Sequence, residues 1–341
     1  MNRTLRQTPG VYLQEEEGFG LRPNIGIRGS GNDRNSRITV MEDGVLIAPA
    51  PYAAPAAYYF PRMARIAGVE VSKGPAAIVY GPLTTGGALN LFSTPIPDQL
   101  GLSGRLDVLG GEYGAFRGRA MAGGWFGAGA ALQAGGMLEA LRESSDGFKR
   151  LDSGGATGFE IDDMVLRLGL RSAPGAGLTQ SLEFKFQHSE ETSDETYLGL
   201  TLADFNATPF RRYRGSQLDR MDVEHDTYQL THRVDLSPAV DLTTIVYRTE
   251  THRLWYKLND VRNSANTGWV GIGAILDDPA AYAAQYAILV GAPGFTSSLS
   301  AGGDLRVRSN NRAYYAQGVQ SVLALAFDTG PASHQLQVSA R

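Results

Sequence analysis

Residues 68–92 decide the fold of the first part of the chain, and they read GVEVSKGPAAIVYGPLTTGGALNLF. Two short apolar segments, 68–71 and 88–92, are strand candidates, and a loop rich in glycine and proline separates them. The loop glycines permit positive φ or a close backbone approach, which tight turns in a small domain need. Residues 81–87 have the spacing of a phosphate-binding loop, but Gly87 stands where the essential lysine must be. Nucleotide binding is therefore excluded.

The rest of the first hundred residues has the same character. Further strand candidates lie at 24–29 and 38–41, and no alternation of apolar and polar residues extends beyond about six positions. Pro95 and Pro97 then end the region, because a proline cannot donate a ladder hydrogen bond. We therefore predict a compact mixed α/β domain over residues 1–98.

From residue 101 onward the pattern changes to segments of about ten residues with strict period-two alternation, the length at which a tilted strand crosses a bilayer. Segments 178–188 and 228–236 are the clearest. We expect one set of their side chains to face lipid, namely Leu182, Phe184, Phe186, Leu230 and Val234. The lumen should receive the alternating polar set, which includes Glu183, Lys185 and Arg233.

The connections between these segments separate two fold classes. A soluble β-sandwich shows the same alternation, so periodicity alone does not distinguish a sandwich from a membrane barrel. Here long connections at about 142–160, 189–224 and 257–311 alternate with tight ones near 127–129, 173–177, 237–238 and 329–332. In outer-membrane barrels the long loops lie at one end and the tight turns lie at the other, periplasmic end. We predict that residues 99–341 form the first part of an antiparallel transmembrane β-barrel.

About nine strands fit into residues 99–341, and an open set of strands leaves edges that lipid cannot solvate. We therefore expect the barrel to continue beyond Arg341. Residues 1–10 contain no apolar core of a signal peptide, so an exported protein with this start is expected to have lost its leader.

Composition excludes several functional classes. The net charge of -4 does not suit a phosphate backbone, so nucleic acid is not an expected partner. The sequence has no cysteine, which rules out disulfides, thiol nucleophiles and Cys-ligated metals. Its five histidines lack any metal-ligand spacing, and no nucleophile–base pair or carboxylate dyad stands out. We therefore expect that the protein is not an enzyme and that it holds neither a resident metal nor a cofactor.

Four ordered motifs in residues 8–95 carry a family resemblance. These are PGV at 9–11, RPNIGIRG at 22–29, VMEDGV at 40–45, and the combination of VEVSKGP at 69–75, YG at 80–81 and GGALN at 86–90. Together they resemble the plug domain of TonB-dependent outer-membrane receptors. The resemblance implies a plug enclosed by a barrel. The residues of the motifs are most similar to those of the ferric dicitrate group.

The resemblance also implies a lock between plug and barrel. In these receptors two plug cations pair with barrel glutamates, and the matching positions here are Arg28 and Lys73. Lys73 departs from the family pattern, which usually has arginine, so bidentate pairing is in doubt at that position. The partner glutamates are expected past Arg341.

Two sets of residues are candidates for ligand binding. The resemblance places the substrate on plug loops that correspond to 30–37 and 48–60, where the candidates are Asn32, Asp33, Arg34, Arg37, Tyr52, Tyr58 and Tyr59. In the third long loop, Arg211, Arg212 and Arg214 could clamp an anionic chelate, because guanidinium groups match carboxylates. A solvated charged loop is the competing interpretation for both sets.

The sequence thus predicts a receptor in the outer membrane of a Gram-negative cell that imports a ferric chelate, most simply ferric citrate or a similar anionic siderophore. The implied partners are the TonB energy complex of the inner membrane, the chelate and outer-membrane lipid. A segment grasped by TonB is expected before the plug. Alternatives are a passive porin or adhesion barrel, and a TonB-dependent receptor for haem or cobalamin. The motifs at 22–29 and 69–90 argue against a barrel without a plug.

Overall fold

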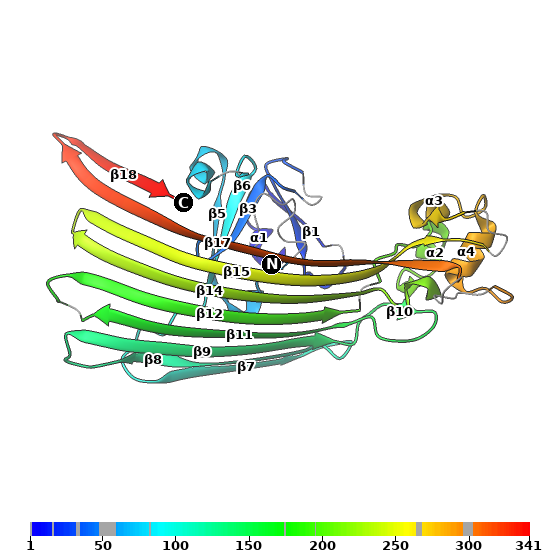
Figure 1. Cartoon of the computed structure of the whole chain (residues 1–341), viewed down its shortest axis with the longest axis horizontal. Coiled ribbons are helices and arrows are strands. Elements are labelled where there is room, and N and C mark those ends of the chain that lie inside the picture. Colours follow the sequence, from blue (N-terminus) through cyan, green and yellow to red (C-terminus); the bar gives the residue numbers. More distant parts are fainter. Residues whose placement is uncertain are drawn as a thin grey trace.

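The computed structural model describes residues 2–15, 17–31, 35–47, 59–81, 83–173, 175–194, 196–263, 268–295 and 303–341. A short helix, α1 (Asn2–Leu5), and two small sheets precede one long antiparallel sheet. We call the first part the plug and the long sheet the wall. Figure 1 shows the plug packed on one face of the wall, which we call the inner face.

The plug contains both small sheets. One pairs β1 (Val11–Glu15) with β2 (Pro23–Ile27). The other has the order β4-β3-β6-β5, with β3 (Ile38–Glu42), β4 (Val45–Leu46), β5 (Ile66–Ser72) and β6 (Gly87–Ser93). Strands β3 and β6 pair in parallel and are almost wholly buried, which is why they show no regular alternation of apolar and polar residues. All four predicted plug strands are present, whereas β1 and β4 were not foreseen.

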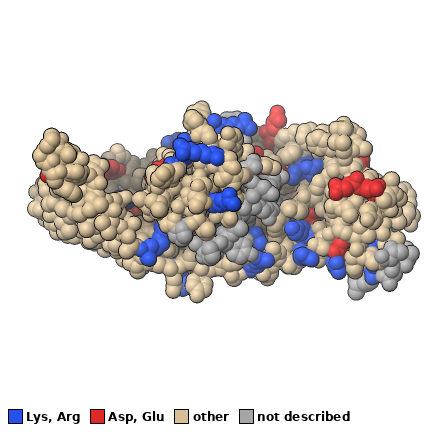
Figure 2. Space-filling view, turned by 90° about the horizontal axis from the view of Figure 1, so that it is seen from above, with Lys and Arg blue, Asp and Glu red and all other residues tan. Residues whose placement is uncertain are grey.

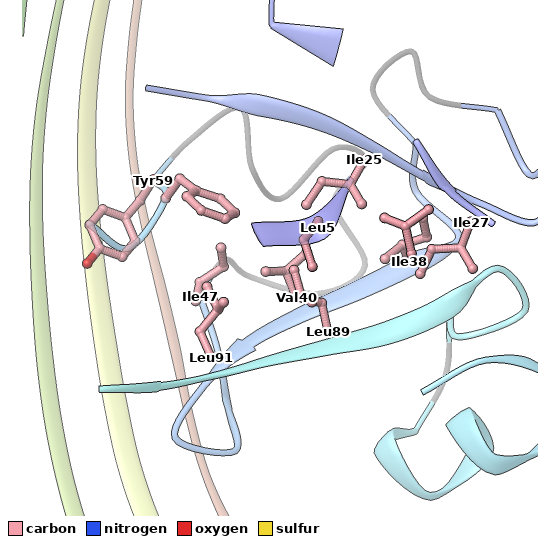
Figure 3. Packing of buried hydrophobic residues seen from close by; sticks show 11 residues of the cluster. Leu5, Ile25, Ile27, Ile38, Val40, Ile47, Tyr59, Leu89 and Leu91 are labelled. Atoms are coloured by element: carbon pink, nitrogen blue, oxygen red, sulfur yellow. The ribbon is translucent and has the colours of Figure 1, made fainter. Parts of the chain in front are cut away.

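The plug has a hydrophobic core of its own. Side chains from α1, β2, β3 and β6 form it, among them Leu5, Ile25, Val40 and Leu89, and every buried member lies before residue 92. Figure 3 shows these side chains converging between the two small sheets, while Tyr59 points toward the wall strands. The 3-10 helices η2 (Met63–Arg65) and η3 (Gly74–Tyr80) complete the connections. The plug therefore packs largely without apolar help from the wall.

The wall has nine long strands in sequence order within the described residues, as the alternation predicts. They are β7 (Ser103–Gly110), β8 (Phe116–Phe126), β9 (Leu132–Ser145), β11 (Phe159–Ser172), β12 (Thr179–Ser193), β14 (Arg220–Ser237), β15 (Val240–Val261), β17 (Leu305–Thr329) and β18 (Ala332–Ala340). All neighbours are antiparallel, and the short β16 (Val270–Gly271) adds to β15. The mixed α/β plug followed by an unclosed antiparallel wall is thus confirmed. The predicted boundary at 98/99 lies between β6 and β7, and we propose to keep it there.

Seven of the nine wall strands are longer than the ten residues expected from the alternation, whereas β7 and β18 are slightly shorter. Strand β15 has 22 residues and β17 has 25. At about 3.3 Å per residue, 22 residues span about 70 Å, over twice the hydrocarbon thickness of about 30 Å. Charged pairs such as Arg142–Asp162 continue the ladder past the apolar segment. The long loops consequently begin later than predicted, at residues 146, 194 and 262.

The two faces of the wall follow the predicted alternation. On the outer face Leu182 is 39% exposed and Leu230 is 41% exposed, whereas Lys185, on the inner face, is 2% exposed. Val234 shares the outer parity, but it lies between Gln180 and Leu242 on the neighbouring strands and is only 7% exposed. Val234 thus keeps the predicted outward parity, although its neighbours cover it more than they cover Leu182 and Leu230.

The loops differ at the two ends of the wall, and Figure 1 shows tight turns at the left and the loop helices at the right. These helices are α2 (Leu202–Ala207), α3 (Ile272–Asp277) and α4 (Ala283–Val290). Helix α4 ends as its sequence suggests, at Gly291 with φ 71°. Just before α4, the Asp278 carboxylate accepts a hydrogen bond from the Ala281 amide at 3.0 Å and holds a turn there. No helix in the described residues is long and apolar enough to span a membrane.

A matched pair of substitutions tests which face meets lipid. Val246 lies on the outer face and is 46% exposed, whereas Val322 lines a cavity between plug and wall. We expect Val246→Arg to lower the free energy of unfolding in lipid vesicles by about 2–4 kcal/mol, and Val322→Arg to change it little. Denaturant unfolding of the full-length protein measures both. Equal losses for the two variants would contradict the assignment of the faces.

Candidate functional site

A two-residue turn brings the plug to the wall. Strands β3 and β4 are joined by Asp43 and Gly44, with φ of 50° and 80°, the primed turn for which Asp-Gly is favoured. The turn lies on the inner face, where the Gln229 side chain donates to the Asp43 carbonyl at 3.3 Å and the Gln320 side chain donates to the Gly44 carbonyl at 3.0 Å. The turn therefore carries Glu42 and Asp43 against the wall.

Two wall cations meet these carboxylates. The Lys185 ammonium on β12 lies 2.5 Å from Glu42 Oε1 and 2.7 Å from Asp43 Oδ2. The Arg167 guanidinium on β11 lies 2.8 Å from Asp43 Oδ2 and also donates to Ser93 Oγ of the plug at 2.6 Å. Both cations are at most 6% exposed in their side chains. Plug and wall are thus joined by buried charges of opposite sign.

Arg65 of the plug extends the same cluster. Its side chain is wholly buried and forms two bonds to Glu42, at 2.5 and 3.0 Å, while its Nε lies 2.9 Å from Asp163 Oδ1 of the wall. It also donates to the Tyr59 hydroxyl at 2.7 Å. We call Glu42, Asp43, Arg65, Asp163, Arg167 and Lys185 the plug–wall ion cluster. The sequence interpretation missed it, although the EDG motif and the inner parity of Lys185 were both visible.

The pKa values of the two plug carboxyls follow from this pairing. Burial by itself raises the pKa of Glu42, but the charges of Arg65 and Lys185 outweigh it and hold that pKa far below its usual range. The pKa of Asp43 is likewise lowered, because Lys185 and Arg167 outweigh burial and the repulsion from Glu42. Both groups are therefore ionised at neutral pH.

The predicted lock residues lie at another edge of the plug. The Lys73 ammonium donates to the Pro9 carbonyl at 3.0 Å, and the Arg28 amide donates to the Gly10 carbonyl at 2.8 Å. Both cations thus lie beside the same turn. Neither has a carboxylate partner among the residues that the structure describes, so their pairing with later glutamates stays a prediction.

The plug residues predicted to bind ligand divide into two groups. Asn32, Asp33, Arg34, Tyr52 and Tyr58 lie outside the described residues. Arg37 is exposed, and its carbonyl accepts from the Gly86 amide at 2.8 Å.

Tyr59 lies inside the interface between plug and wall. It is 5% exposed, and its ring stacks on His225 of the wall with centroids 3.7 Å apart. Its hydroxyl also contacts Gln187 of the wall. This residue therefore belongs to the contact between plug and wall rather than to an exposed ligand loop.

The three loop arginines differ in their surroundings. Arg211 is paired within the loops, with Asp152 at 2.9 Å and Asp204 at 3.1 Å, so its charge is already neutralised. Arg214 is exposed on η4 (Arg214–Ser216). Arg212 is half-buried and lies on β13 (Arg211–Arg212), which pairs in parallel with β10 (Arg150–Leu151) of the preceding long loop.

Two long loops fold together around one carboxylate. Asp204 accepts a hydrogen bond from the Tyr213 hydroxyl at 2.6 Å within its own loop, and another from Tyr286 on α4 of the next long loop. Beneath it, Tyr213, Ile275, Ile288 and other apolar residues form a separate core. The outer end of the wall therefore carries a folded cap rather than independent loops.

A cavity of about 380 Å³ lies between the plug and the outer-loop end of the wall. Its plug side includes Phe19, Leu21 and Arg62, and its wall side includes Phe148 and Phe159. Figure 2 shows Lys and Arg side chains spread over the middle of the plug face, with few charges at the tight-turn end. The volume of the cavity is in the range of small-molecule sites. The sequence interpretation missed this cavity, because single phenylalanines in separate loops give no pattern.

Comparisons with known proteins agree on the fold. A family model described as TonB-dependent Receptor Plug Domain matches residues 1–88. The structure of the ferric citrate transporter FecA in its unliganded form is similar over 99% of this chain and 44% of FecA, with a TM-score of 0.68 and 20% identity.

Two further structures show the same similarity. FpvA of P. aeruginosa, bound to heterologous pyoverdines, has a TM-score of 0.64 and 12% identity over 99% of this chain and 39% of its own. The ferric-catecholate import receptor Fiu of E. coli K12, in its open form, has a TM-score of 0.62 and 14% identity over 99% and 45%. This chain thus spans less than half of each, and identities this low establish the fold alone.

Removing one member of the plug–wall ion cluster tests its contribution. In Lys185→Met, Glu42 and Asp43 lose a cation in a buried site, and we expect the free energy of unfolding to fall by about 3–5 kcal/mol. Arg142→Met is the control, because its pair with Asp162 is about half exposed and should contribute about 0–1 kcal/mol. Denaturant unfolding of the full-length protein compares the two. A loss below 1 kcal/mol for Lys185→Met would show that the cluster is not stabilising.

The lowered pKa values give a pH dependence with a definite sign. Glu42 and Asp43 contribute stability above the ordinary carboxyl pKa of about 4, and the contribution is lost as pH falls through their lowered values. We expect hydrogen-exchange protection of residues 38–46, corrected for intrinsic rates, to be constant from about pH 8 to 5 and to decrease only below about pH 4. A loss of protection between pH 7 and 5 would contradict this.

Proposed function

We propose that the full-length protein is an outer-membrane importer of a ferric chelate, because residues 1–88 match the model of the TonB-dependent receptor plug domain and the whole chain is similar in fold to solved receptors of ferric chelates. Proteins of this family are transport receptors and not enzymes. The proposed partners are the chelate, the lipid of the outer membrane and the TonB energy complex of the inner membrane. The proposed location is the outer membrane of a Gram-negative cell.

The observation that carries this proposal is the seating of the plug on the inner face through the plug–wall ion cluster. A passive porin needs an open lumen, whereas here the plug covers the inner side of β11 and β12 and contacts β14 and β17 through Gln229 and Gln320. Further polar contacts join Thr94 of the plug to Glu139 of β9, and Arg22 of the plug to Glu191 of β12. A plug held this widely supports gated import over free diffusion.

Release of a chelate inward requires the plug to move relative to the wall. Because its main apolar core lies within the plug, the plug can shift as a folded unit once its contacts with the wall, which include the packing of Val45 on Ile245 and Tyr247, are exchanged for water. The ion pairs can make this exchange if water enters the interface as the plug moves, because water then solvates each freed charge. The energy complex is proposed to supply the work of breaking the cluster.

The choice of chelate rests on charge. Arg37 and Arg214 are exposed and Arg212 is half-buried, and these cations favour an anionic complex. Ferric citrate, the ligand in the name of FecA, meets that requirement, as does any anionic siderophore. Haem and cobalamin remain the alternatives for a receptor of this fold.

An uptake assay tests the proposed function. The full-length protein is produced in cells that lack their own ferric-chelate receptors, and radioactive iron is supplied as anionic chelates, with haem and cobalamin tested separately. We expect uptake of at least one ferric chelate that stops when the TonB complex is inactivated. Chelate entry that does not depend on TonB would favour the porin, and uptake of only haem or cobalamin would favour the other receptor classes.

A further inference from the structure

The segment that joins the plug to the wall, residues 94–101, is itself bonded to the wall, and we call it the linker. The Trp125 amide, at the tight-turn end of β8, donates to the Gln99 carbonyl at 3.2 Å. The Gly101 amide donates to the Trp125 carbonyl at 2.7 Å, and Leu100 forms a parallel bridge with Trp125. The linker backbone therefore joins the wall ladder before β7 begins.

Glycines shape the surface that receives the linker. A β-carbon at Gly124 would overlap the carbonyl oxygen of Gly101, so only glycine lets the linker approach β8 there. Gly135 of β9 and Gly169 of β11 face each other, and a β-carbon at either would lie 2.6 or 2.7 Å from the Trp125 ring. These positions accommodate both the linker and the ring against which it packs.

An apolar contact and a charged contact fix the same linker. Ile96 is buried in a cluster with Trp125 and Val165, which is separate from the plug core. The Arg171 guanidinium of β11 lies 4.2 Å from the centroid of the Trp125 ring. Arg171 also pairs with the Asp98 carboxylate and donates to the Asp98 carbonyl at 3.3 Å. Backbone, apolar and charged groups thus all hold the linker on the wall.

Thr94 is the point at which the plug meets the linker. Its amide donates to the Arg65 carbonyl of the plug at 3.0 Å, while its hydroxyl accepts from Arg119 of the wall at 2.9 Å. The prolines on both sides of Ile96 restrict the backbone just beyond it. Thr94 is therefore the residue about which the plug can turn relative to a fixed linker.

The plug and the linker are held by different kinds of contact. The plug–wall ion cluster joins side-chain charges, and water can solvate these charges when they separate. Release of the linker would instead expose Ile96 and the Trp125 ring to water, a cost that hydration does not return. The two attachments can therefore be released independently.

We propose that the linker stays docked on β8, β9 and β11 while the plug is displaced, so that the plug turns about Thr94 and stays tethered at one side of the wall. The plug then separates from β17 and β18, which lie at the other end of the strand order. A cavity of about 520 Å³ already lies between η3 and these strands. The inference rests on the proposed function and adds the direction in which the plug moves.

Cross-linking tests the inference, because the sequence has no cysteine of its own. One full-length variant carries Asp98→Cys and Arg171→Cys across the linker contact. The other carries Tyr80→Cys and Arg341→Cys, where the Arg341 side chain donates to the Tyr80 carbonyl at 3.3 Å, the same distance as in the linker pair. A short, reducible bis-thiosulfonate reagent joins each pair in cells.

The readout is TonB-dependent uptake of radioactive iron(III), supplied as its citrate complex and separately as its 2,3-dihydroxybenzoate complex. We expect the link at Tyr80 to lower uptake about tenfold or more, and the link at Asp98 to change it less than about twofold, because only the first prevents the displacement. Reduction of the reagent should restore uptake. Equal losses for both links, or no loss for either, would overturn the inference.

Hydrogen exchange of the full-length protein in lipid vesicles gives an arm that needs no chelate. In Lys185→Met we expect the amides of residues 38–46 to exchange about tenfold or more faster, because the ion cluster is weakened. The amides of Gly101 and Trp125 should keep their wild-type rates. Wild-type protein below about pH 4, where Glu42 and Asp43 take up protons, replaces Lys185→Met if that variant does not fold.

The converse variant is Gly124→Ala, whose β-carbon displaces the Gly101 carbonyl. It should raise the exchange of the Trp125 amide about tenfold or more and leave residues 38–46 unchanged. Gly136→Ala is the control, because Gly136 faces Gly124 across the ladder and a β-carbon there has ordinary van der Waals contacts.

The outcomes separate the two proposals. If residues 38–46 and the Trp125 amide always lose protection together, the plug and the linker release as one unit and the inference is overturned. If the wild type imports neither iron complex, the proposed function fails for these chelates, while the exchange arm still decides whether the linker stays docked.

Discussion

The structure depends on one interaction, the burial of Glu42 and Asp43 of the plug against Lys185 and Arg167 of the wall, with Arg65 between them. Charges taken out of water are tolerated only when each meets an opposite charge, and here the two carboxylates share three cations. The geometry leaves little freedom, because the primed turn fixes both carboxylates on one plug edge and the wall ladder fixes both cations on adjacent strands. Plug position and wall register therefore specify each other.

The alternation of the wall strands serves two environments at once. Outward residues such as Leu182 and Leu230 suit lipid, while the inward positions of the same strands carry the polar groups that bind the plug. A wall built to pack on an apolar plug would have lost this division, and the plug would then be part of a common core. Because the plug core is its own, the contact is mostly polar and can be exchanged for water. That property is the one that the proposed import mechanism requires of the plug.

The outer end of the wall is organised by different forces. Asp204 joins two long loops through tyrosine hydroxyls, and an apolar core beneath it stabilises the cap. An edge-to-face contact between Phe19 and Phe148, with ring centroids 5.2 Å apart, links the plug to the loop that carries Phe148. Loops held in this way lose less conformational entropy when they bind a ligand, so more of the contact energy remains as affinity.

By itself the sequence determined the elements and their faces. Period-two alternation assigned Lys185 inward and Leu230 outward, because the face on which a side chain lies depends on its neighbours along the chain. Only the tertiary structure decided which groups meet. Lys185 lies more than 140 residues from Glu42, and a parity pattern names a face but not a partner.

The ligand residues show the same limit. Tyr59 and Arg211 are residue types that often contact ligands. In the folded chain, however, Tyr59 stacks on His225 and Arg211 pairs with Asp152. Phe19 and Phe148 had no sequence signal, because their proximity is created by the seating of the plug. Local patterns carry information about backbone geometry and exposure, whereas pairing of distant charges and rings is set by the packing of separate elements, which no short stretch of sequence contains.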